Sequence, residues 1–529
     1  MTKDPLALKE QQRIEVQAML DAAKTQAERN RMGQFATPPA LALEILAYAK
    51  KLMPWTNKIR FLDPGLGTGA FYSALLQIFP ASRISAAVGY EIDPHYAHPA
   101  LQLWSEAKLD VRISDFTKAS PPEEGFNLLI CNPPYVRHHH LMNGEKARIQ
   151  AASHNAGGIE FGGLAGLYCH FLGLSHAWMA EGGIAGWLIP SEFMDVNYGA
   201  AVKRYLLNKV TLLHIHRFDP YDVQFGDALV SSAVVWLKKE SPAKDYDIQF
   251  TFGGTLLAPR VSRMISARVL RIEPKWTRFP LSEIRTIENG PTLSDFFSIR
   301  RGLATGDNSY FILTAKQIAE RNLPPEFFIP ILPSPRHLPV TEIPSDEQGN
   351  PVIENPLFLL DCRLPEAAVK TRYQSLWRYL QEGKERGVAD RYLCQHRSPW
   401  YAQENRPPPP FVCTYLGRGN VKSGRPFRFI LNQSRGTVTN VYLALYPKEP
   451  LARVIKRHPP SARVVWEILN RICPQSMLTE GRVYGGGLHK LEPKELAKVP
   501  AIELAEHFPE IRKHHQTAIN STWANNYRE

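Results

Sequence analysis

The apolar run FNLLIC at 126–131 is followed directly by a short polar segment, Asn132-Pro133-Pro134-Tyr135, which is expected to form a rigid corner. The two prolines restrict the backbone, so the side-chain oxygen of Asn132 and the carbonyl oxygen of Pro133 can point at one spot. Two acceptors that converge on a planar amino group bind its hydrogens and concentrate the nitrogen lone pair for attack on a methyl group. Tyr135 offers an aromatic face for stacking a planar substrate. We therefore predict catalytic roles for Asn132, Pro133 and Tyr135, exerted through positioning and electrostatics.

A glycine-rich turn, DPGLGTG at 63–69, lies between an apolar run and a helical stretch. Gly65, Gly67 and Gly69 allow a tight turn and a close approach of the backbone to a ligand. Asp63 would repel a pyrophosphate group, so the turn favours a cationic ligand, such as an amino acid carried on a sulfonium nucleoside. We predict that these four residues bind the cofactor.

Acidic residues follow the next two apolar runs. Glu91 ends the second run, where a carboxylate can accept hydrogen bonds from both ribose hydroxyls. Asp115 follows the third run and could accept from an exocyclic amine of adenine, and Phe116 could offer its backbone N–H to a ring nitrogen. Three successive strand ends would then form one adenosine pocket.

The elements that must position these residues alternate between short apolar runs and helical stretches. This rhythm predicts an α/β fold with a doubly wound, mainly parallel sheet. The last two strands could form an antiparallel pair at the sheet edge, and Thr37 fits the N-cap of a helix that begins at Pro38. The predicted strands are 59–63, 86–91, 111–113, 126–131, 184–190, 211–217 and 229–237, and the predicted helices include 5–30, 69–79, 95–108 and 167–181.

The alternation of strands and helices ends near residue 245. This predicts a first domain over 1–245, which begins with a helix in 1–30. It also predicts a second, mixed α+β domain over 250–529. Charge divides in the same way: residues 1–250 hold 24 basic and 25 acidic side chains, and residues 251–529 hold 39 and 26. A positive field of this kind attracts polyanions, so the second half is expected to bind nucleic acid.

The chain has 529 residues, a net charge of +12 and six cysteines without a CxxC pair. This pattern excludes a disulfide-built scaffold and argues against a zinc site, and adjacent histidines at 138–140 cannot easily share one ion. We predict no metal. The polar N-terminus and the lack of a long uncharged apolar run predict a cytoplasmic protein without membrane association.

The order GQFATPP, DPGLGTG, GYEIDP, SDF and NPPY resembles the gamma-class DNA adenine-N6 methyltransferases of restriction–modification systems, most closely the TaqI type. The resemblance covers nearly the whole chain. It implies a class I methyltransferase fold, S-adenosyl-L-methionine as cofactor and a flipped adenine in double-stranded DNA as target. It implies that Phe35, Thr37 and Pro38 cover the methionine part of S-adenosyl-L-methionine. It also supports the cofactor-binding and target-amine roles predicted above.

The resemblance extends to the second half, which it implies is a target-recognition domain. Phe225 lies where the family often has a second aromatic residue that packs, with Tyr135, against the extruded base. The segments RGLATGDN at 301–308 and YGGGLHK at 484–490 resemble the recognition domain, so Arg301, Thr305 and Lys490 are candidate DNA contacts. We expect a monomer, with a separate cognate restriction endonuclease as a candidate partner.

Several alternatives stay open. Transfer to cytosine N4, to an RNA base or to a protein glutamine would use the same corner, although cytosine N4 enzymes usually have serine at the position of Asn132. Cytosine C5 chemistry needs a nucleophilic cysteine, and Cys131 is expected inside a buried strand. A non-catalytic DNA-binding module with this fold is a different class, against which the intact Asp63, Glu91 and Asn132 argue. No cleavage domain is evident.

Overall fold

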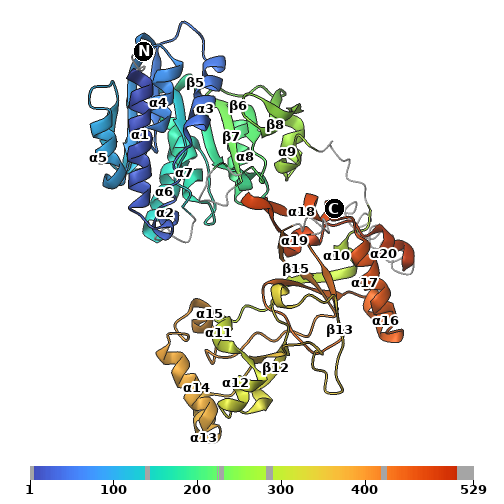
Figure 1. Ribbon diagram of the computed structural model, residues 1–529. Coiled ribbons are helices and arrows are strands. Elements are labelled where there is room, and N and C mark those ends of the chain that lie inside the picture. Colours follow the sequence, from blue (N-terminus) through green and yellow to red (C-terminus); the bar gives the residue numbers. More distant parts are fainter. Residues whose placement is uncertain are drawn as a thin grey trace, which may run out of the picture. The chain divides into compact units, whose positions relative to one another are not determined.

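The computed structural model describes residues 5–136, 143–222, 224, 231–281, 290–418 and 426–508. Phe225 and the histidines at 138–140 lie outside the described residues. The chain divides into two compact units, Met1–Thr286 with Tyr484–Gly487, and Ile287–Val483 with Leu488–Glu529. Figure 1 shows both, coloured along the sequence. None of the helices in the described ranges combines the length and the apolar character that crossing a membrane requires.

Unit 1 is built, within its described residues, on a nine-stranded sheet in the order β3-β2-β1-β4-β5-β7-β6-β8-β9. Strands β1 to β5 run parallel, and β7 pairs antiparallel with both β5 and β6. The strand order reverses between β1 and β4, and ligands of open α/β sheets bind at such a point. The predicted doubly wound sheet is confirmed. Its strands are β1 (Ile59–Asp63), β2 (Ile84–Glu91), β3 (Asp110–Ile113), β4 (Phe126–Cys131), β5 (Met179–Pro190), β6 (Thr211–Arg217), β7 (Ser232–Lys238), β8 (Asp247–Gly254) and β9 (Pro259–Ser266).

Side chains alternate between the two faces of this sheet, as the period of a strand requires. Phe61 of β1 packs into one core cluster, with α3, α4 and α5, whereas the adjacent Leu62 packs into another, with α7, α8 and α9. Helices therefore cover both faces (Figure 1). The helices of unit 1 are α1 (Pro5–Ala22), α2 (Gln26–Met32), α3 (Pro39–Leu52), α4 (Ala70–Ile78), α5 (Pro94–Leu103), α6 (Asn143–Gly157), α7 (Leu167–Leu174), α8 (Gly199–Asn208) and α9 (Ala267–Ile272).

The structure corrects several expected boundaries. The β6–β7 pair is antiparallel as predicted but does not form the sheet edge, because β8 and β9 extend the sheet beyond residue 245. The helix expected over 5–30 is interrupted at Thr25, whose side chain caps α2 together with Glu28. The helix expected to reach residue 181 ends at Leu174. Thr37 is not a cap, because α3 begins at Pro39 and Pro38 takes the cap position.

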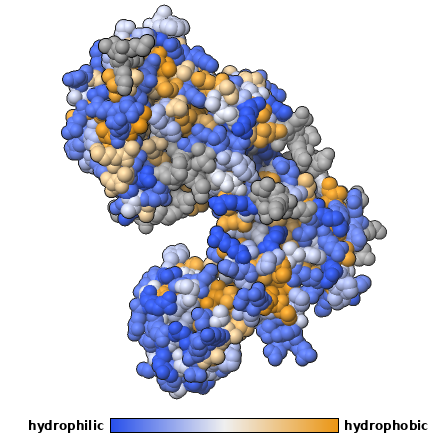
Figure 2. All heavy atoms as spheres, in the orientation of Figure 1, coloured by the Kyte–Doolittle hydropathy of each residue, from blue (hydrophilic) through white to orange (hydrophobic). Residues whose placement is uncertain are grey.

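Unit 2 contains a mixed α+β fold, as predicted, with three separate sheets among its described residues. Their orders are β10-β18-β15-β17-β13, β11-β14-β12 and β16-β20-β19. The surface over α13 and α14 is mainly hydrophilic (Figure 2). The strands are β10 (Phe297–Arg301), β11 (Ile312–Thr314), β12 (Phe328–Ile331), β13 (Glu342–Ile343), β14 (Leu357–Leu360), β15 (Phe411–Thr414), β16 (Leu416–Arg418), β17 (Phe429–Asn432), β18 (Tyr442–Pro447), β19 (Arg482–Tyr484) and β20 (Leu488–Lys490). The helices are α10 (Leu293–Phe296), α11 (Asn308–Phe311), α12 (Ala315–Glu320), α13 (Glu366–Arg372), α14 (Gln374–Glu385), α15 (Tyr392–Gln395), α16 (Leu451–Arg457), α17 (Ser461–Arg471), α18 (Pro474–Glu480), α19 (Pro493–Leu496) and α20 (Ile502–His507).

Candidate active site

A pocket opens in unit 1 where β1 and β4 end. Three predicted segments meet there: the turn before α3, the glycine turn after β1, and the corner after β4. The lining also includes Gln17 of α1, for which the sequence pattern predicted no role. The lining residues are Gln17, Phe35, Ala36, Thr37, Gly65, Leu66, Gly67, Thr68, Ala70, Phe71 and Asn132.

The side-chain amide of Asn132 has a fixed orientation in this pocket. Its Nδ2 donates to the carbonyl oxygen of Phe35 at 3.0 Å and to Oγ1 of Thr37 at 3.1 Å. A carbonyl oxygen only accepts, so the amide nitrogen must face Phe35 and the amide oxygen must face away from it. That oxygen, Oδ1, is buried and has no hydrogen-bond partner within the described residues. A buried, unsatisfied acceptor is costly, and this one is oriented to receive an N–H donor.

Gly33 brings the N-terminal turn against the corner. Its carbonyl oxygen accepts from the backbone N–H of Tyr135 at 3.1 Å. Its φ is +65°, and a Cβ at this position would lie 2.4 Å from the backbone nitrogen of Tyr135. Only glycine fits such a conformation and approach. The glycine that opens GQFATPP is therefore required by its contact with NPPY.

Tyr135 is half-buried beside Phe35, with ring centroids 5.6 Å apart and planes inclined at 41°. Its hydroxyl donates to the carbonyl oxygen of Leu188 at 3.1 Å, and burial raises its pKa well above the usual range. Pro133 is buried between the two functional positions. The hydroxyl is thus anchored to β5, so Tyr135 contributes a neutral, fixed ring.

Asp63 ends β1 with only 1% of its surface exposed. Its Oδ1 accepts from the backbone N–H of Gly65 at 3.1 Å, and its Oδ2 has no hydrogen-bond partner among the described residues. Burial raises its pKa to about 8, with a smaller contribution from the charge of Glu91. A nearby positive charge favours the ionised form of such a buried acid.

The glycine turn is shaped by close backbone approaches. Gly67 and Gly69 have φ of +55° and +89°. The backbone N–H of Gly67 donates to Oε2 of Glu91 at 3.0 Å, and that of Asp93 donates to its Oε1 at 2.8 Å. Burial raises the pKa of Glu91 although both hydrogen bonds oppose the shift. The acid predicted to bind ribose therefore also holds the glycine turn in place.

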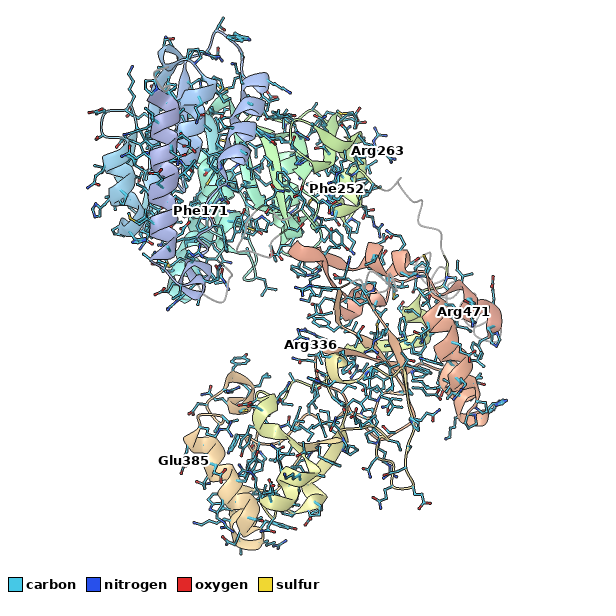
Figure 3. All side chains as sticks on the ribbon, in the orientation of Figure 1. Phe171, Phe252, Arg263, Arg336, Glu385 and Arg471 are labelled. Carbon is cyan, nitrogen blue, oxygen red and sulfur yellow. The ribbon has the colours of Figure 1, made fainter. Side chains whose placement is uncertain are left out.

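Asp115 and Phe116 follow β3 as predicted but do not line the described part of the pocket. Oδ1 of Asp115 accepts from the backbone N–H and the hydroxyl of Thr117, at 2.9 and 2.7 Å. The Phe116 ring is buried, with its centroid 5.4 Å from that of Phe171, which is labelled in Figure 3. The Phe116 side chain belongs to the core, so only its backbone is available for a ligand.

Two candidate DNA contacts of unit 2 converge on one tyrosine ring. The guanidinium carbon of Arg301 lies 4.2 Å and Nζ of Lys490 lies 5.3 Å from the ring centroid of Tyr415. Glu492 lies beside both cations, at 4.0 Å from Arg301 Nε and 2.9 Å from Lys490 Nζ. Burial opposes ionisation of Glu492, but the hydrogen bonds from Lys490 and Tyr415 and the charge of Arg301 lower its pKa. This cation–tyrosine cluster carries two positive charges and one negative charge.

The prediction of a DNA contact at Thr305 is wrong for its side chain. Only 2% of Thr305 is exposed, and its hydroxyl donates to Oδ1 of Asn308 at 2.6 Å. Its carbonyl oxygen accepts from Nη1 of Arg397 at 2.7 Å. Thr305 therefore supports the turn after β10 from within.

Comparisons with known proteins agree with this arrangement. The family described as "Eco57I restriction-modification methylase" matches residues 92–224, and the family described as "Type II methyltransferase M.Eco57I, C-terminal domain" matches residues 274–526. Type II methyltransferase M.XamI of Xanthomonas campestris pv. amaranthicola is 29% identical over 485 residues, which cover 89% of this chain and 86% of the relative. The chain is thus similar to Type II restriction–modification methyltransferases over most of its length. Type II methyltransferase M.AccI of Acinetobacter calcoaceticus is 24% identical, over 90% of this chain and 86% of the relative.

Two solved structures share the fold of this chain over most of its length. The Type IIL restriction–modification enzyme MmeI, solved in complex with DNA, has a TM-score of 0.53 at 12% identity and covers 91% of this chain and 65% of its own. DrdV, also solved with DNA, has a TM-score of 0.52 at 12% identity, over 87% of this chain and 55% of its own. The predicted class I methyltransferase fold is confirmed.

The sequence pattern gave no indication of two polar residues of α1 that lie at the site. Gln17 lines the pocket, and Arg13 is 2% exposed with its Nη1 donating to Oγ1 of Thr68 at 3.1 Å. A polar helix face normally faces water, so composition gave no signal for either residue. The N-terminal helix is therefore part of the site.

Proposed function

We propose that the chain is a site-specific DNA methyltransferase that transfers a methyl group from S-adenosyl-L-methionine to N6 of an adenine flipped out of double-stranded DNA. The observation that carries the proposal is Oδ1 of Asn132, which is buried, has no partner among the described residues and is held in one orientation by Phe35 and Thr37. An adenine amine would supply the missing donor.

The residues at and near the strand ends of unit 1 fit the cofactor. A sulfonium nucleoside with an amino-acid tail brings positive charge, which would favour ionisation of the buried Asp63, whose Oδ2 has no partner in the described residues. Glu91 would accept from the ribose hydroxyls, and Asp115 and the backbone of Phe116 would bind adenine. Gly65, Gly67 and Gly69 would let the chain pass close to the ligand, and Phe35, Thr37 and Pro38 would cover the methionine part.

When bound, the cofactor supplies an electrophilic methyl group. Asn132 Oδ1 and the carbonyl oxygen of Pro133 would accept the two amine hydrogens and keep the nitrogen lone pair directed at that methyl group. The new N–C bond forms as the methyl–sulfur bond breaks, and the amine then loses one proton to solvent. Tyr135 would stack on the base, and Phe225 is proposed to pack on it as well. Extrusion costs a few kcal/mol, which such stacking offsets.

We propose double-stranded DNA as the partner of unit 2, which would then act as the target-recognition domain. The relatives named Type II methyltransferases support this choice, as does the excess of basic residues beyond residue 250. Arg301 and Lys490 are the proposed contacts, and their shared tyrosine keeps both cations on one surface. We also propose that the enzyme is a monomer and that a separate restriction endonuclease is its cognate partner.

A second candidate is transfer to a different amino group. A release factor glutamine methyltransferase of Koribacter versatilis is 32% identical over 92 residues, or 16% of this chain. Since that match leaves most of the chain uncovered, whereas M.XamI matches 89% of it, the DNA substrate is favoured. Cytosine N4 and RNA bases are further substrates to be tested.

The experiment offers tritium-labelled S-adenosyl-L-methionine with duplex DNA, total RNA or a glutamine-containing peptide. The DNA is then digested, and its nucleosides are separated. We expect label only in DNA, and there only in N6-methyladenine. Label in N4-methylcytosine, RNA or peptide would reassign the substrate, and no label in any of them would contradict the enzymatic assignment.

A further inference from the structure

Arg217, the last residue of β6, lies at the same edge of the sheet as Asn132. β4 and β5 run parallel, and β5 and β6 both pair antiparallel with β7, so β6 runs in the same direction as β4. The ends of β4 and β6 therefore share the carboxyl edge of the sheet. Neighbouring strands are about 4.8 Å apart, so the three steps from β4 to β6 place Arg217 roughly 14 Å from Asn132 along this edge.

The guanidinium of Arg217 lies over an aromatic ring. Its central carbon is 4.6 Å from the ring centroid of Phe252 in β8, which is labelled in Figure 3. The side chain is half-buried, and its Nε is buried without a hydrogen-bond partner among the described residues. Within the same residues the guanidinium forms no ion pair, and it interacts with acids only through their more distant charge. Its donors are thus available to an anion.

The two acids whose charges act on Arg217 are engaged elsewhere. Asp195 Oδ2 accepts from the hydroxyl of Thr277 at 2.6 Å. Asp219 Oδ2 accepts from Nη1 of Arg260 at 2.9 Å. Burial lowers the pKa of Arg217 to about 10, although both acids oppose this shift. The described residues therefore give this partly desolvated cation no direct counter-ion, which is a costly arrangement in the absence of a ligand.

We infer that Arg217 binds a phosphate of the DNA backbone close to the extruded nucleotide. The inference rests on the proposed function, because it assumes that a base reaches Asn132 and that its backbone passes along this edge of the sheet. A guanidinium presents paired donors that match phosphate oxygens, and stacking on Phe252 restricts its orientation. Arg217 also precedes the segment that leads to Phe225, which is proposed to pack on the same base.

The test uses a fluorescently labelled duplex that the wild-type protein methylates, with S-adenosylhomocysteine present and binding followed by anisotropy over a range of salt concentrations. Arg217→Met keeps the aliphatic part of the side chain and removes the charge. We expect it to weaken DNA binding about 10-fold and to reduce the slope of log K against log salt by about one, because one phosphate contact is lost. Arg217→Lys should keep the slope and lose less affinity, because it retains the charge without the paired donors.

Two further measurements separate phosphate binding from a structural role. Removal of a buried charge that lacks a direct counter-ion should leave the melting temperature of Arg217→Met unchanged or higher, with S-adenosylhomocysteine affinity within about 2-fold of wild type. Arg268→Gln is the matched control, since Arg268 pairs with Asp245 at 2.7 Å and follows β9, whose last residue pairs with the first residue of β8 at the opposite edge. It should bind DNA as the wild type does.

An unchanged DNA affinity or an unchanged salt slope in Arg217→Met would overturn the inference. A lower melting temperature together with weaker S-adenosylhomocysteine binding would overturn it too, since Arg217 would then support the fold. An equal loss of DNA affinity in Arg268→Gln would show that the effect is not specific to this edge and would also contradict the inference. A wild-type protein that methylates no duplex DNA would instead overturn the proposed function.

Discussion

Thr37 accepts a hydrogen bond from Asn132 across 95 residues of sequence, with 3.1 Å between Oγ1 and Nδ2. Thr37 is not the helix cap that its position before a proline suggests, because Pro38 takes that place. The hydroxyl is instead free to orient the amide of the corner. The N-terminal turn therefore helps to set the direction of the acceptor that the proposed reaction uses.

Replacing Thr37 with valine tests this coupling. Thr37→Val keeps the shape of the side chain but removes one of the two acceptors of Asn132 Nδ2, so the amide gains rotational freedom. We expect single-turnover methyl transfer to slow about 10-fold. Thr37→Ser retains the hydroxyl and should stay close to wild type. Equal rates for the valine and serine variants would show that Phe35 alone orients the amide.

The raised pKa of Asp63 predicts proton release when the cofactor binds. With a pKa of about 8, Asp63 is mainly protonated at pH 7 in the free protein. A bound cation favours the carboxylate, so binding should release about one proton per site at pH 7. Calorimetry in two buffers of different ionisation enthalpy measures this proton. Asp63→Asn should bind more weakly and without buffer dependence, whereas a buffer-independent heat in the wild-type protein would refute the prediction.

Glu492 should limit DNA affinity because it neutralises part of the charge of Arg301 and Lys490. Glu492→Gln should tighten binding to duplex DNA about 3- to 10-fold and steepen its salt dependence, whereas Arg301→Gln should do the opposite. Glu385→Gln is the control, since Glu385 is an exposed carboxylate of the same unit (Figure 3). Fluorescence anisotropy over a range of salt concentrations gives both quantities. Weaker binding by Glu492→Gln would mean that the carboxylate mainly orders the cluster.

Two buried histidines should make unit 1 sensitive to acid. His214 and His216 share the hydroxyl of Thr251, with nitrogen–oxygen distances of 2.7 and 2.8 Å. Burial lowers their pKa values to about 3 and about 4, so the folded protein keeps both neutral. The unfolded chain binds protons below pH 6.5, so stability present above that pH is lost as pH falls toward 4.

At pH 5 this loss amounts to about 2 kcal/mol per histidine. Thermal unfolding at pH 7 and pH 5 measures it. His216→Phe should lower stability at pH 7, because Thr251 loses a partner, yet lose less stability than wild type between the two pH values. An equal loss in both proteins would show that His216 does not contribute to the acid sensitivity.

The sequence predicted the site best where a pattern coincided with a strand end. Asp63, Glu91 and Asn132 each follow or end a buried strand of the parallel sheet, and topology then brings such positions to one edge. Gln17 was missed because its role depends on where α1 packs, which local composition does not encode. Thr305 was misassigned because burial depends on partners distant in sequence, such as Arg397.

The first domain was placed too short for a related reason. β8 and β9 follow a polar stretch, so they resemble the start of a new region, yet β8 pairs with β6 and β9 pairs with β8, which extends the same sheet. Pairing between distant strands is decided by tertiary packing and not by local pattern. Phe225 stays a prediction, since it lies outside the described residues.

The proposed role of Asn132 is tested most directly by methyl transfer in the Asn132→Ala variant, measured as N6-methyladenine formed in duplex DNA under single-turnover conditions, with S-adenosylhomocysteine binding measured in parallel. We expect transfer to fall by at least about 100-fold while the variant still binds S-adenosylhomocysteine, because Asn132 Oδ1 acts on the target amine. Transfer at a rate close to wild type, with the cofactor site intact, would show that Asn132 does not act on the amine.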